Sequence, residues 1–529
     1  MNNMADQQFP DDVIALKKLL LEAFSANNNL SDELGKKTKQ IHNLEETIRY
    51  LKHLKFGRST EKFSSTQGDL FNEAELLSED SAAIEETGRS SDKKTVTKNR
   101  ARSKPRTLQQ LPDDIQRNEV FHDLPEHEKH CSCSCSCGCQ LVRSGTERSE
   151  QLEVVPPKFS VTVHIRHTYA CKHCDGQLKT ATKPAQPIEK SFASSSLLAY
   201  IIVSKYLYAL PIHRQEKIYE SLKVPLKRNT MATWVINSEI IIAPLLKRFE
   251  YYLLKERYIQ CDETRTQVLN EPNKRPDQVS QMWVRRSMGD IPITLFNYTE
   301  TRSGDEACAL LAGYSGYLQT DDYAGYNKAV KENGLLHLGC NAHARRKFDE
   351  AKKAEPKIKG HQKYTGAELG LLFYKRLYTI EADIKTLTPA ERFNTRLTRS
   401  IPVFKRLTRW AELKLAKATT KSKLSKALSY LLRNKEKLMM YCCDQILNID
   451  NNLTEGAIRP FVIGRKNWLF SSTPKGAVAS AAYYSLVETA KANNVNVFDY
   501  LKYLFEKLPQ LKSTDDIDDF LPWNVKLPA

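Results

Sequence analysis

The sequence predicts a multidomain α/β protein, and three observations lead to this fold class. The chain has 529 residues, which is too long for a single hydrophobic core and predicts roughly three to five domains or subdomains. Hydrophobic residues make up 41% of the chain and charged residues 27%, as in ordinary globular proteins rather than disordered or fibrous ones. Strand patterns and helix patterns both occur, in separate parts of the chain.

Residues 11–56 are expected to form a coiled-coil helix. With Val13 as heptad position a, ten of the twelve a and d positions are apolar, and such a seam can join two chains. Asn27 at an a position would set the register. Two alternatives stay open: the Asn27–Asn29 run together with Gly35 could split the helix, or the helix could pack on its own domain. The a and d positions are Val13, Leu16, Leu20, Ala23, Asn27, Leu30, Leu34, Lys37, Ile41, Leu44, Ile48 and Leu51.

Residues 76–115 are polar and charged, and little in them could form a core. This composition predicts a linker. Its basic run, Lys98 to Arg106, could also follow DNA phosphates, but a solvated linker is the simpler interpretation.

Residues 116–190 are expected to form a small zinc-binding unit. Cys171 and Cys174 form a Cys-x-x-Cys knuckle, and a second group of cysteines lies about thirty residues earlier, as tetrahedral zinc requires. The upstream ligands proposed are Cys135 and Cys137. Cys139 and His130 are substitutes, and a reduced Cys/Ser tract is the alternative to a metal site. Alternating apolar residues between the two groups predict strands; they are Val161, Val163 and Ile165.

Residues 191–250 are predicted to form three helices. The third begins after a turn that ends at Arg228, where Asn229 or Thr230 can cap its exposed first turn. This spacing is typical of a helix-turn-helix whose third helix enters a DNA major groove. Arg228, Thr230 and Thr233 are the candidate DNA-contacting residues. A helical bundle without a DNA role is the alternative.

Residues 251–350 are expected to form the first part of a catalytic core. Three strand patterns, a helix and a fourth strand follow one another, and this order suits a ribonuclease-H-like sheet. The first and fourth strands lie side by side in that arrangement, so Asp262 and Asp321 at their ends could face each other. The segments are Tyr258–Thr264, Gln281–Arg286, Ile291–Tyr298, Ser303–Leu311 and Gly316–Tyr323.

Two facing carboxylates repel each other unless a cation lies between them. Magnesium takes hard oxygen ligands, so Asp262 and Asp321 are candidate Mg²⁺ ligands, with Mn²⁺ as a substitute. Phosphoryl transfer uses two such ions about 3.5–4 Å apart, one for the nucleophile and one for the leaving oxygen.

Residues 446–500 are expected to supply the third carboxylate, Glu455. It lies in a helical stretch that Pro460 is expected to close, and Arg459 falls one helical turn later on the same face. Arg459 could orient the carboxylate or contact a phosphate. The candidate DNA-contacting cations around the three acids are Arg345, Arg346, Lys347, Arg459, Arg465 and Lys466.

Residues 351–445 separate the second acid from the third, and their Leu, Lys and Arg recur at helical spacing. They predict an all-helical insertion that carries basic surface over DNA, and a helical bundle with solvated lysines is the alternative. Residues 501–529 are expected to form a C-terminal tail.

The net charge of the chain further limits the classes of function that fit it. Lys and Arg total 80 against 63 Asp and Glu, which gives a net charge of +17 and a pI near 9.1. This excess disfavours a generic metabolic enzyme and favours a polyanionic partner. The sequence contains no run long enough for a membrane span, and the polar start, Met1 to Asp12, does not suggest a secretory signal. We therefore expect a cytoplasmic chain without a membrane partner.

Several motifs, taken together, resemble the transposases of the bacterial insertion-sequence family sixty-six, the TnpC-type DDE transposases. The resemblance runs nearly from end to end of the chain. It also includes Phe56–Ser59, His213–Gln215 and Leu521–Trp523. Around the acids, the matching motifs are Cys261–Thr264, Leu318–Tyr326, Cys340–Phe348, and Asp450–Glu455 through Gly464–Asn467.

The resemblance implies an enzyme that binds the terminal inverted repeats of its mobile element, cuts the DNA ends and joins them to target DNA in a recombination reaction. By motif position, Asp262, Asp321 and Glu455 would be its metal ligands. Asp322 stands where a glycine is usual, which leaves Asp321 and Asp322 as alternatives. Cys340 and His343 fit a Cys-x-x-His signature seen in several DDE groups, with a core histidine as the alternative for His343.

The resemblance also implies partners. A homodimer or higher assembly on DNA is expected, and accessory transposition proteins are plausible because members of the family are typically encoded beside small helper proteins. The rival hypothesis is a transposase-derived DNA-binding regulator that has lost catalysis. The presence of all three acids argues against that loss.

Overall fold

The computed structural model describes residues 13–56, 157–170, 178–182, 185–272, 274–275, 277–355, 364–511 and 515–528. The chain divides into two compact units, one of Met1–Ser59 with Lys183–Ala529 and the other of Thr60–Thr182. The proposed zinc ligands Cys135, Cys137, Cys171 and Cys174, their substitutes His130 and Cys139, and the 76–115 linker lie outside the described residues.

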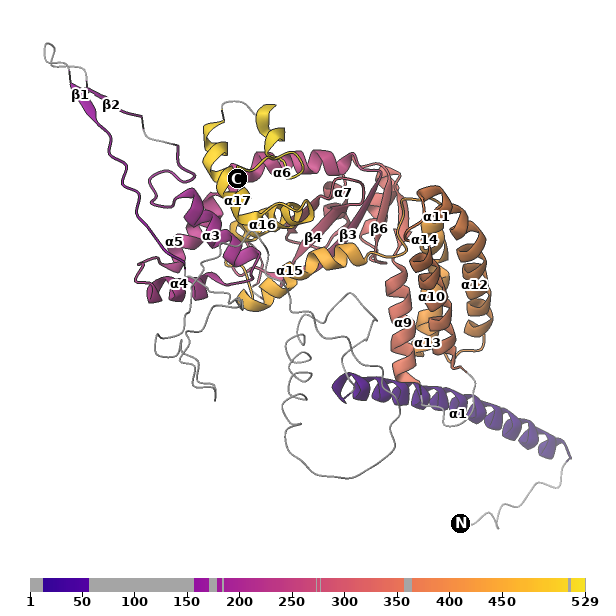
Figure 1. Ribbon diagram of the computed structural model, residues 1–529. Helices are drawn as coiled ribbons and strands as arrows, with labels where there is room; N and C mark the ends of the chain where they lie inside the picture. The colour runs from indigo at the N-terminus through magenta and orange to yellow at the C-terminus, as the bar shows by residue number, and fades with distance from the viewer. Residues whose placement is uncertain are drawn as a thin grey trace, which may run out of the picture. The chain divides into compact units, whose positions relative to one another are not determined.

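A five-stranded sheet forms the centre of the larger unit (Figure 1). Its order is β5-β4-β3-β6-β7, with β3–β4 and β4–β5 antiparallel and β3–β6 and β6–β7 parallel. As the sequence predicts, the first and fourth strands of this sheet pair directly. The strands are β3 (Tyr258–Gln267), β4 (Val279–Ser287), β5 (Thr294–Thr299), β6 (Tyr317–Thr320) and β7 (Leu336–Gly339).

The predicted helix between β5 and β6 is present as α7 (Gly304–Leu310). Two elements in this part of the chain were not predicted, α8 (Tyr326–Asn333) and strand β7. Gly334 ends α8 in the left-handed conformation, with a φ of 63° that glycine adopts without strain. The chain then returns through β7 to the parallel side of the sheet, where it pairs with β6.

The helices α15 (Asn452–Trp468) and α16 (Pro474–Ala492) pack on this sheet. The backbone N–H of Phe296 in β5 donates to Ser485 Oγ at 2.8 Å, which fixes α16 against the edge strand. Alanines and serines dominate the buried residues of α16, so its backbone can approach the sheet closely. The expectation that Pro460 closes the Glu455 helix is wrong, because α15 continues through Pro460 to Trp468 and gives up only the hydrogen bond that proline cannot donate.

The region predicted as three helices contains four: α3 (Ser195–Tyr206), α4 (Ile212–Ser221), α5 (Arg228–Asn237) and α6 (Glu239–Leu254). The expected cap at Asn229 or Thr230 is wrong, since α5 begins one residue earlier. Lys227 is its N-cap without a side-chain bond, and the Glu216 carboxylate instead accepts from the Arg228 N–H at 3.1 Å.

Three of these helices, α3, α5 and α6, pack on the C-terminal helices of the same unit, and α4 packs on α3 and α5. Tyr206 of α3 stacks on Tyr483 of α16 with ring centroids 5.5 Å apart, and α3 also contacts α17 (Val497–Lys507). Residues 501–529, expected to be a tail, include most of α17 and the 3₁₀ helix Asp515–Phe520. Arg248 of α6 forms a bidentate pair with Asp518, and Leu521 is fully buried.

The described residues between β7 and α15 are helical apart from short turns, as the sequence predicts (Figure 1). Their core is built from the apolar faces of α9, α10, α12 and α13, among them Phe348, Tyr374, Leu407 and Leu428. The buried Arg396 pairs with Glu381 at 2.7 Å. The helices are α9 (Asn341–Ala354), α10 (Gly366–Asp383), α11 (Pro389–Thr395), α12 (Ile401–Leu415), α13 (Lys423–Arg433) and α14 (Lys435–Met439), with the π-helix Arg396–Ser400 and the 3₁₀ helix Met440–Cys442.

The N-terminal helix α1 runs without a break over Val13–Phe56, so the Asn27–Asn29 run does not split it. Its C-terminal half contacts α9. Asn43 donates to the Thr420 carbonyl at 3.1 Å, and Glu46 accepts from the Lys423 N–H at 2.9 Å. Both residues lie opposite the a and d seam, whose leucines remain exposed.

In the smaller unit, β1 (Thr168–Ala170) and β2 (Leu178–Thr180) form an antiparallel pair. The strands expected around Val161, Val163 and Ile165 are absent: residues 157–167 contain no strand, and these three side chains are 74–90% exposed. Without a partner surface, their alternation does not lead to a sheet. None of the helices described in either unit is both long and apolar enough for a membrane span.

Candidate active site

Asp262 and Asp321 lie at equivalent positions relative to the pairing of β3 with β6. The registered pairing ends at Gln260 and Gln319, and each aspartate follows two residues later. Asp321 directly follows the last residue of β6, as expected for an acid at a strand end. The same expectation is wrong for Asp262, because β3 continues past it to Gln267 and pairs there with β4.

The start of α15 is tied to the middle of β3, next to Asp262. The Asn451 side chain donates to the Cys261 carbonyl at 3.0 Å, and Thr454 Oγ1 donates to Gln260 Oε1 at 2.9 Å. Gln260 in turn donates to Gln319 at 2.7 Å. All of these side chains are buried. They fix the first turn of α15, which carries Glu455, beside Asp262 and the end of β6.

The three acids lie close enough to act on one another electrostatically. Burial, followed by the negative charges of Glu263, Glu455 and Asp321, raises the pKa of Asp262 to about 8. Glu263 has its own partners, the guanidinium of Arg302 and the hydroxyl of Tyr326. The Asp262 carboxylate accepts a hydrogen bond from the Glu263 N–H at 2.9 Å. This group of carboxylates carries more negative charge than the side chains around it neutralise.

Asp321 and Asp322 face different partners. Asp321 contributes to the raised pKa of Asp262 and accepts from the Tyr323 N–H at 2.9 Å. Asp322 forms an ion pair with Arg433 of α13 in the helical insertion. Of the two alternatives that the sequence left open, Asp321 is therefore the one that belongs with Asp262.

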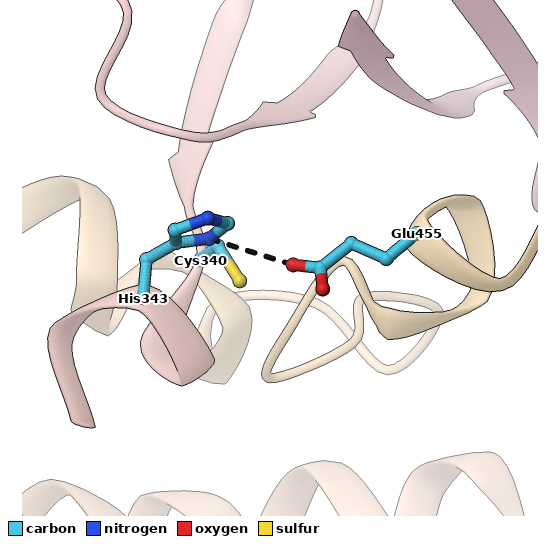
Figure 2. A group of neighbouring side chains, drawn as sticks. All are labelled: Cys340, His343 and Glu455. Atoms are coloured by element: carbon cyan, nitrogen blue, oxygen red, sulfur yellow. Dashed lines mark ion pairs between the residues drawn. The ribbon is translucent and has the colours of Figure 1, made fainter. Parts of the chain in front are cut away.

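Glu455 lies between two cationic or potentially cationic groups of α9. Its Oε1 is 3.6 Å from Nδ1 of His343 (Figure 2). Its Oε2 is 3.4 Å from Arg346. Neither Glu455 Oε1 nor His343 Nδ1 has a hydrogen-bond partner among the described residues, although both atoms are buried. The His343 side chain is 25% exposed, so it is not a core histidine, and its place beside Glu455 favours a structural role at the acid cluster, the group of Asp262, Asp321 and Glu455.

Cys340 completes a group with His343 and Glu455, in which one ligand atom of each lies within 4.8 Å of the others (Figure 2). Burial raises the pKa of the Cys340 thiol to about 12, so the sulfur is protonated at neutral pH. It accepts from the Asn451 N–H at 3.4 Å. Cys340 therefore supports the Asn451 turn that positions Glu455.

The predicted DNA-contacting residues fall into two sets. Arg345, Arg346 and Lys347 belong to α9, which lies beside Glu455, and Arg459, Arg465 and Lys466 belong to α15, which carries Glu455. Arg228, Thr230 and Thr233 belong instead to α5, which packs on α3, α4, α6 and α16. Arg228 and Thr233 are exposed there, and Thr230 is half-buried.

Sequence reasoning missed the residues that hold the site together. Gln260 and Gln319 are fully buried in the centre of the sheet, and Asn451 and Arg433 join segments far apart in the chain. One signal was available. A glutamine lies two residues before each aspartate, in strands that are otherwise apolar. This is unusual because buried polar groups need partners.

The fold and the site together define an α/β protein in which half-buried carboxylates gather beside the central sheet. Residues 190–479, more than half of the chain, match the family model described as the IS66 transposase family. Three further models match: the IS66 C-terminal element over residues 485–523, the zinc-finger binding domain of transposase IS66 over 130–175, and "Transposase C of IS166 homeodomain" over 43–120. The chain belongs to the IS66 transposase family.

Relatives with the same overall extent occur in Sinorhizobium fredii. The uncharacterized proteins y4qI and y4jD are 32% and 30% identical to the chain over 395 and 403 residues. These alignments cover 72% and 73% of this chain and 72% and 76% of the relatives. No solved structure matches the chain. The match over residues 130–175 supports zinc binding by that segment.

Proposed function

We propose that the chain is a DDE transposase that binds the terminal inverted repeats of an insertion sequence, cuts the DNA and transfers the cut strand to a target. The observation that carries this proposal is the convergence of Asp262, Asp321 and Glu455 from two paired strands and one helix. Membership of the IS66 family supports it. We also assign the sheet to the ribonuclease-H-like class, since its order places the first strand between the second and the fourth.

Divalent cations fit this cluster, and Asp262, Asp321 and Glu455 would hold them. Three carboxylates supply hard oxygen ligands, the pKa of Asp262 is raised by burial and by uncompensated neighbouring charge, and Glu455 Oε1 is buried without a hydrogen bond among the described residues. When bound, Mg²⁺ or Mn²⁺ would stabilise negative charge on the phosphate undergoing transfer.

The chain's own residues orient the reactants. His343 and Arg346 hold the Glu455 carboxylate from the α9 side, while Arg459 and Lys466 are exposed on α15, where they can contact phosphates. In the reaction, a water oxygen bonds to phosphorus, the P–O3′ bond breaks, and the leaving oxygen takes a proton as a 3′-hydroxyl. The oxygen of that hydroxyl then loses its proton and bonds to a phosphorus of the target, while the target's own P–O3′ bond breaks and its O3′ takes a proton. No covalent enzyme intermediate is required, so no nucleophilic serine or tyrosine is needed.

Recognition of the DNA ends is assigned to two parts of the chain. The helix pair α4–α5 would read the terminal repeat through Arg228, Thr230 and Thr233. The segment that matches the zinc-finger model spans all four cysteines proposed as zinc ligands: Cys135, Cys137, Cys171 and Cys174.

We further propose that α1 pairs with a second copy of the chain. Its a and d leucines are exposed, with Leu30 at 64%, Leu34 at 71% and Leu44 at 64%. The opposite face is already docked on the helical insertion through Asn43 and Glu46. A helix held by its polar face with an apolar seam outward is arranged for a coiled coil. Accessory proteins remain plausible further partners.

The test is strand cleavage and joining on a labelled duplex that carries the element end, with Mg²⁺ or Mn²⁺. We expect metal-dependent nicking by the wild type, loss of nicking in Glu455→Ala, and similar end binding by both proteins. Tight, salt-sensitive binding without nicking would favour the regulator hypothesis, and adding the neighbouring accessory proteins then separates a missing helper from lost catalysis.

A further inference from the structure

A cavity of about 560 Å³ opens between α9, the C-terminal end of α12 and α13 of the helical insertion. We call it the insertion pocket. Four of its lining residues are cations and none is acidic. Tyr430 and Ser429 add hydroxyl groups. The cations are Lys347, Lys421, Lys426 and Arg433.

Two residues that line the insertion pocket connect it to the acid cluster of Asp262, Asp321 and Glu455. Arg433 pairs with Asp322, the residue directly after Asp321. Lys347 lies four residues after His343 on α9, and therefore on the same helix face. Burial raises the pKa of Tyr430, and the charges of Asp322 and Asp321 also raise it, so the field of the acid cluster reaches the pocket.

The four cations of the pocket differ in how far neighbouring side chains offset their positive charge. Lys347 Nζ lies 4.6 Å from the centre of the Tyr430 ring, and the Arg433 guanidinium carbon lies 5.8 Å from the same centre. Lys421 and Lys426 are exposed, and the structure gives neither of them an ion pair within the described residues. Like charges gathered at one concave surface repel one another unless an anion binds between them. The pocket is therefore built for a negatively charged ligand.

Phosphodiesters fit this chemistry. Lysine and arginine bind phosphate oxygens through charge-assisted hydrogen bonds, and a neighbouring hydroxyl can donate a further bond. The cavity is larger than one phosphate group requires, so it has room for the sugar on either side.

We propose that the insertion pocket binds a phosphodiester of the DNA strand that is processed at Asp262, Asp321 and Glu455. This inference rests on the proposed function and extends it, since it assigns the helical insertion a defined contact with the substrate. Lys421 and Lys426 are its exposed anchors, and Lys347 and Arg433 connect it to the acid cluster.

The first test is lysine acetylation followed by mass spectrometry, on the full chain with and without a duplex that carries the element end. Neither Mg²⁺ nor Mn²⁺ is added, so that no cleavage occurs and any zinc in the chain is kept. We expect DNA to protect Lys421 and Lys426 at least threefold and to leave Lys385 and Lys405 unprotected. These two control lysines belong to the same insertion, are exposed, and do not line the pocket. Equal modification of Lys421 and Lys426 with and without DNA would overturn the proposal.

A separate arm replaces the duplex with inorganic phosphate at the same concentration of phosphate groups. We expect no protection. Protection by inorganic phosphate equal to that by DNA would identify a site for a free anion and would also overturn the proposal.

The second test compares Lys421→Gln/Lys426→Gln with Lys385→Gln/Lys405→Gln, two variants that lose the same charge. The slope of log affinity against log salt falls by about 0.9 for each phosphate that the protein no longer neutralises. We expect the slope of the pocket variant to be smaller by about 1 to 2 and the control to keep the wild-type slope. Equal slopes in the two variants would contradict the proposal, and matching melting temperatures would establish that both are folded.

Failure of the proposed function gives a different result. If the wild type does not nick DNA with Mg²⁺ or Mn²⁺ while DNA still protects Lys421 and Lys426, the catalytic proposal fails and the DNA contact stands. If nicking occurs while these lysines stay unprotected, the pocket proposal fails and the catalytic one stands.

Discussion

The imidazole of His343 lies 3.6 Å from the carboxylate of Glu455, Nδ1 to Oε1, and links the helix after β7 to the first turn of α15 (Figure 2). The two residues are 112 positions apart and the whole helical insertion lies between them. The contact places His343 beside the third acid, where it can set the orientation of that carboxylate before DNA arrives.

Replacing His343 with alanine is expected to lower the rate of strand cleavage about 10- to 100-fold, the usual effect of removing a residue that orients a metal-binding side chain. Single-turnover cleavage of a labelled duplex measures this rate. His343→Asn should recover part of it, because an amide keeps a polar group beside Glu455. DNA binding should not change. A wild-type rate in His343→Ala would show that Glu455 is oriented without the histidine.

Gly464 in α15 is expected to tolerate no side chain. A Cβ at this position would collide with the Trp468 ring and the Tyr484 hydroxyl, so Gly464→Ala should destabilise the chain by about 1–3 kcal/mol through overpacking. Gly456 in the same helix has open space around it, and Gly456→Ala should be neutral or stabilising by up to about 1 kcal/mol. Urea unfolding measures both. Equal effects of the two substitutions would contradict the packing described for α15 against α16.

His337 makes stability depend on pH. Burial, followed by the charge of Lys437, lowers the pKa of His337 to about 4, whereas an unfolded histidine titrates near 6.5. Between these values the unfolded chain binds a proton that the folded chain does not, so the free energy of unfolding falls as the pH falls through this window. The contribution is at most on the order of 3 kcal/mol.

His337→Gln should reduce this loss, since glutamine does not titrate and its amide can keep a hydrogen bond with Thr320 Oγ1, which lies 2.8 Å from Nε2 of His337. Urea unfolding at pH 6.5 and pH 4.5 measures the difference. The exposed His213 provides the control, and His213→Gln should follow the wild type. An unchanged pH dependence in His337→Gln would mean that this histidine is not buried in its neutral form.

The seam of α1 should hold two chains together. Leu44→Asp places a charge at a d position that is 64% exposed in the single chain, and a charge there disfavours a coiled coil. We expect a shift from dimer to monomer in sedimentation velocity. Lys39→Asp, on the opposite side of the helix, should remain dimeric. A wild type that is monomeric at every concentration tested would refute pairing through α1.

Much of the catalytic region could be predicted from the sequence because its signals are local. The strand around Tyr258–Thr264 and the strand before Asp321 each combine an apolar run with terminal acids, and the chain order of elements was sufficient to predict that these strands pair. The structure confirms that pairing. Glu455 could be singled out only together with its neighbours Asn451 and Arg459, because one glutamate on a helix carries little information.

What could not be predicted depends on contacts between distant segments. Nothing in the sequence indicates that Arg433 pairs with Asp322, which lies 111 residues earlier. Strand β7 has only four residues, one of them exposed, and gains its structure from pairing with β6. Pro460 was expected to end a helix, but the packing of α15 on the sheet outweighs the loss of one hydrogen bond. Tertiary contacts determine all three features: the pairing of Arg433 with Asp322, strand β7, and the continuation of α15 through Pro460.

The most direct test of the whole account is metal-dependent nicking of the element end by four charge-removing variants with minimal change of shape. Asp262→Asn, Asp321→Asn and Glu455→Gln should each abolish nicking with Mg²⁺ and with Mn²⁺. Asp322→Asn should keep it within about tenfold of the wild type, since Asp322 pairs with Arg433 instead. Persistent nicking in any of the first three variants, or complete loss in Asp322→Asn, would contradict the assignment of the three acids.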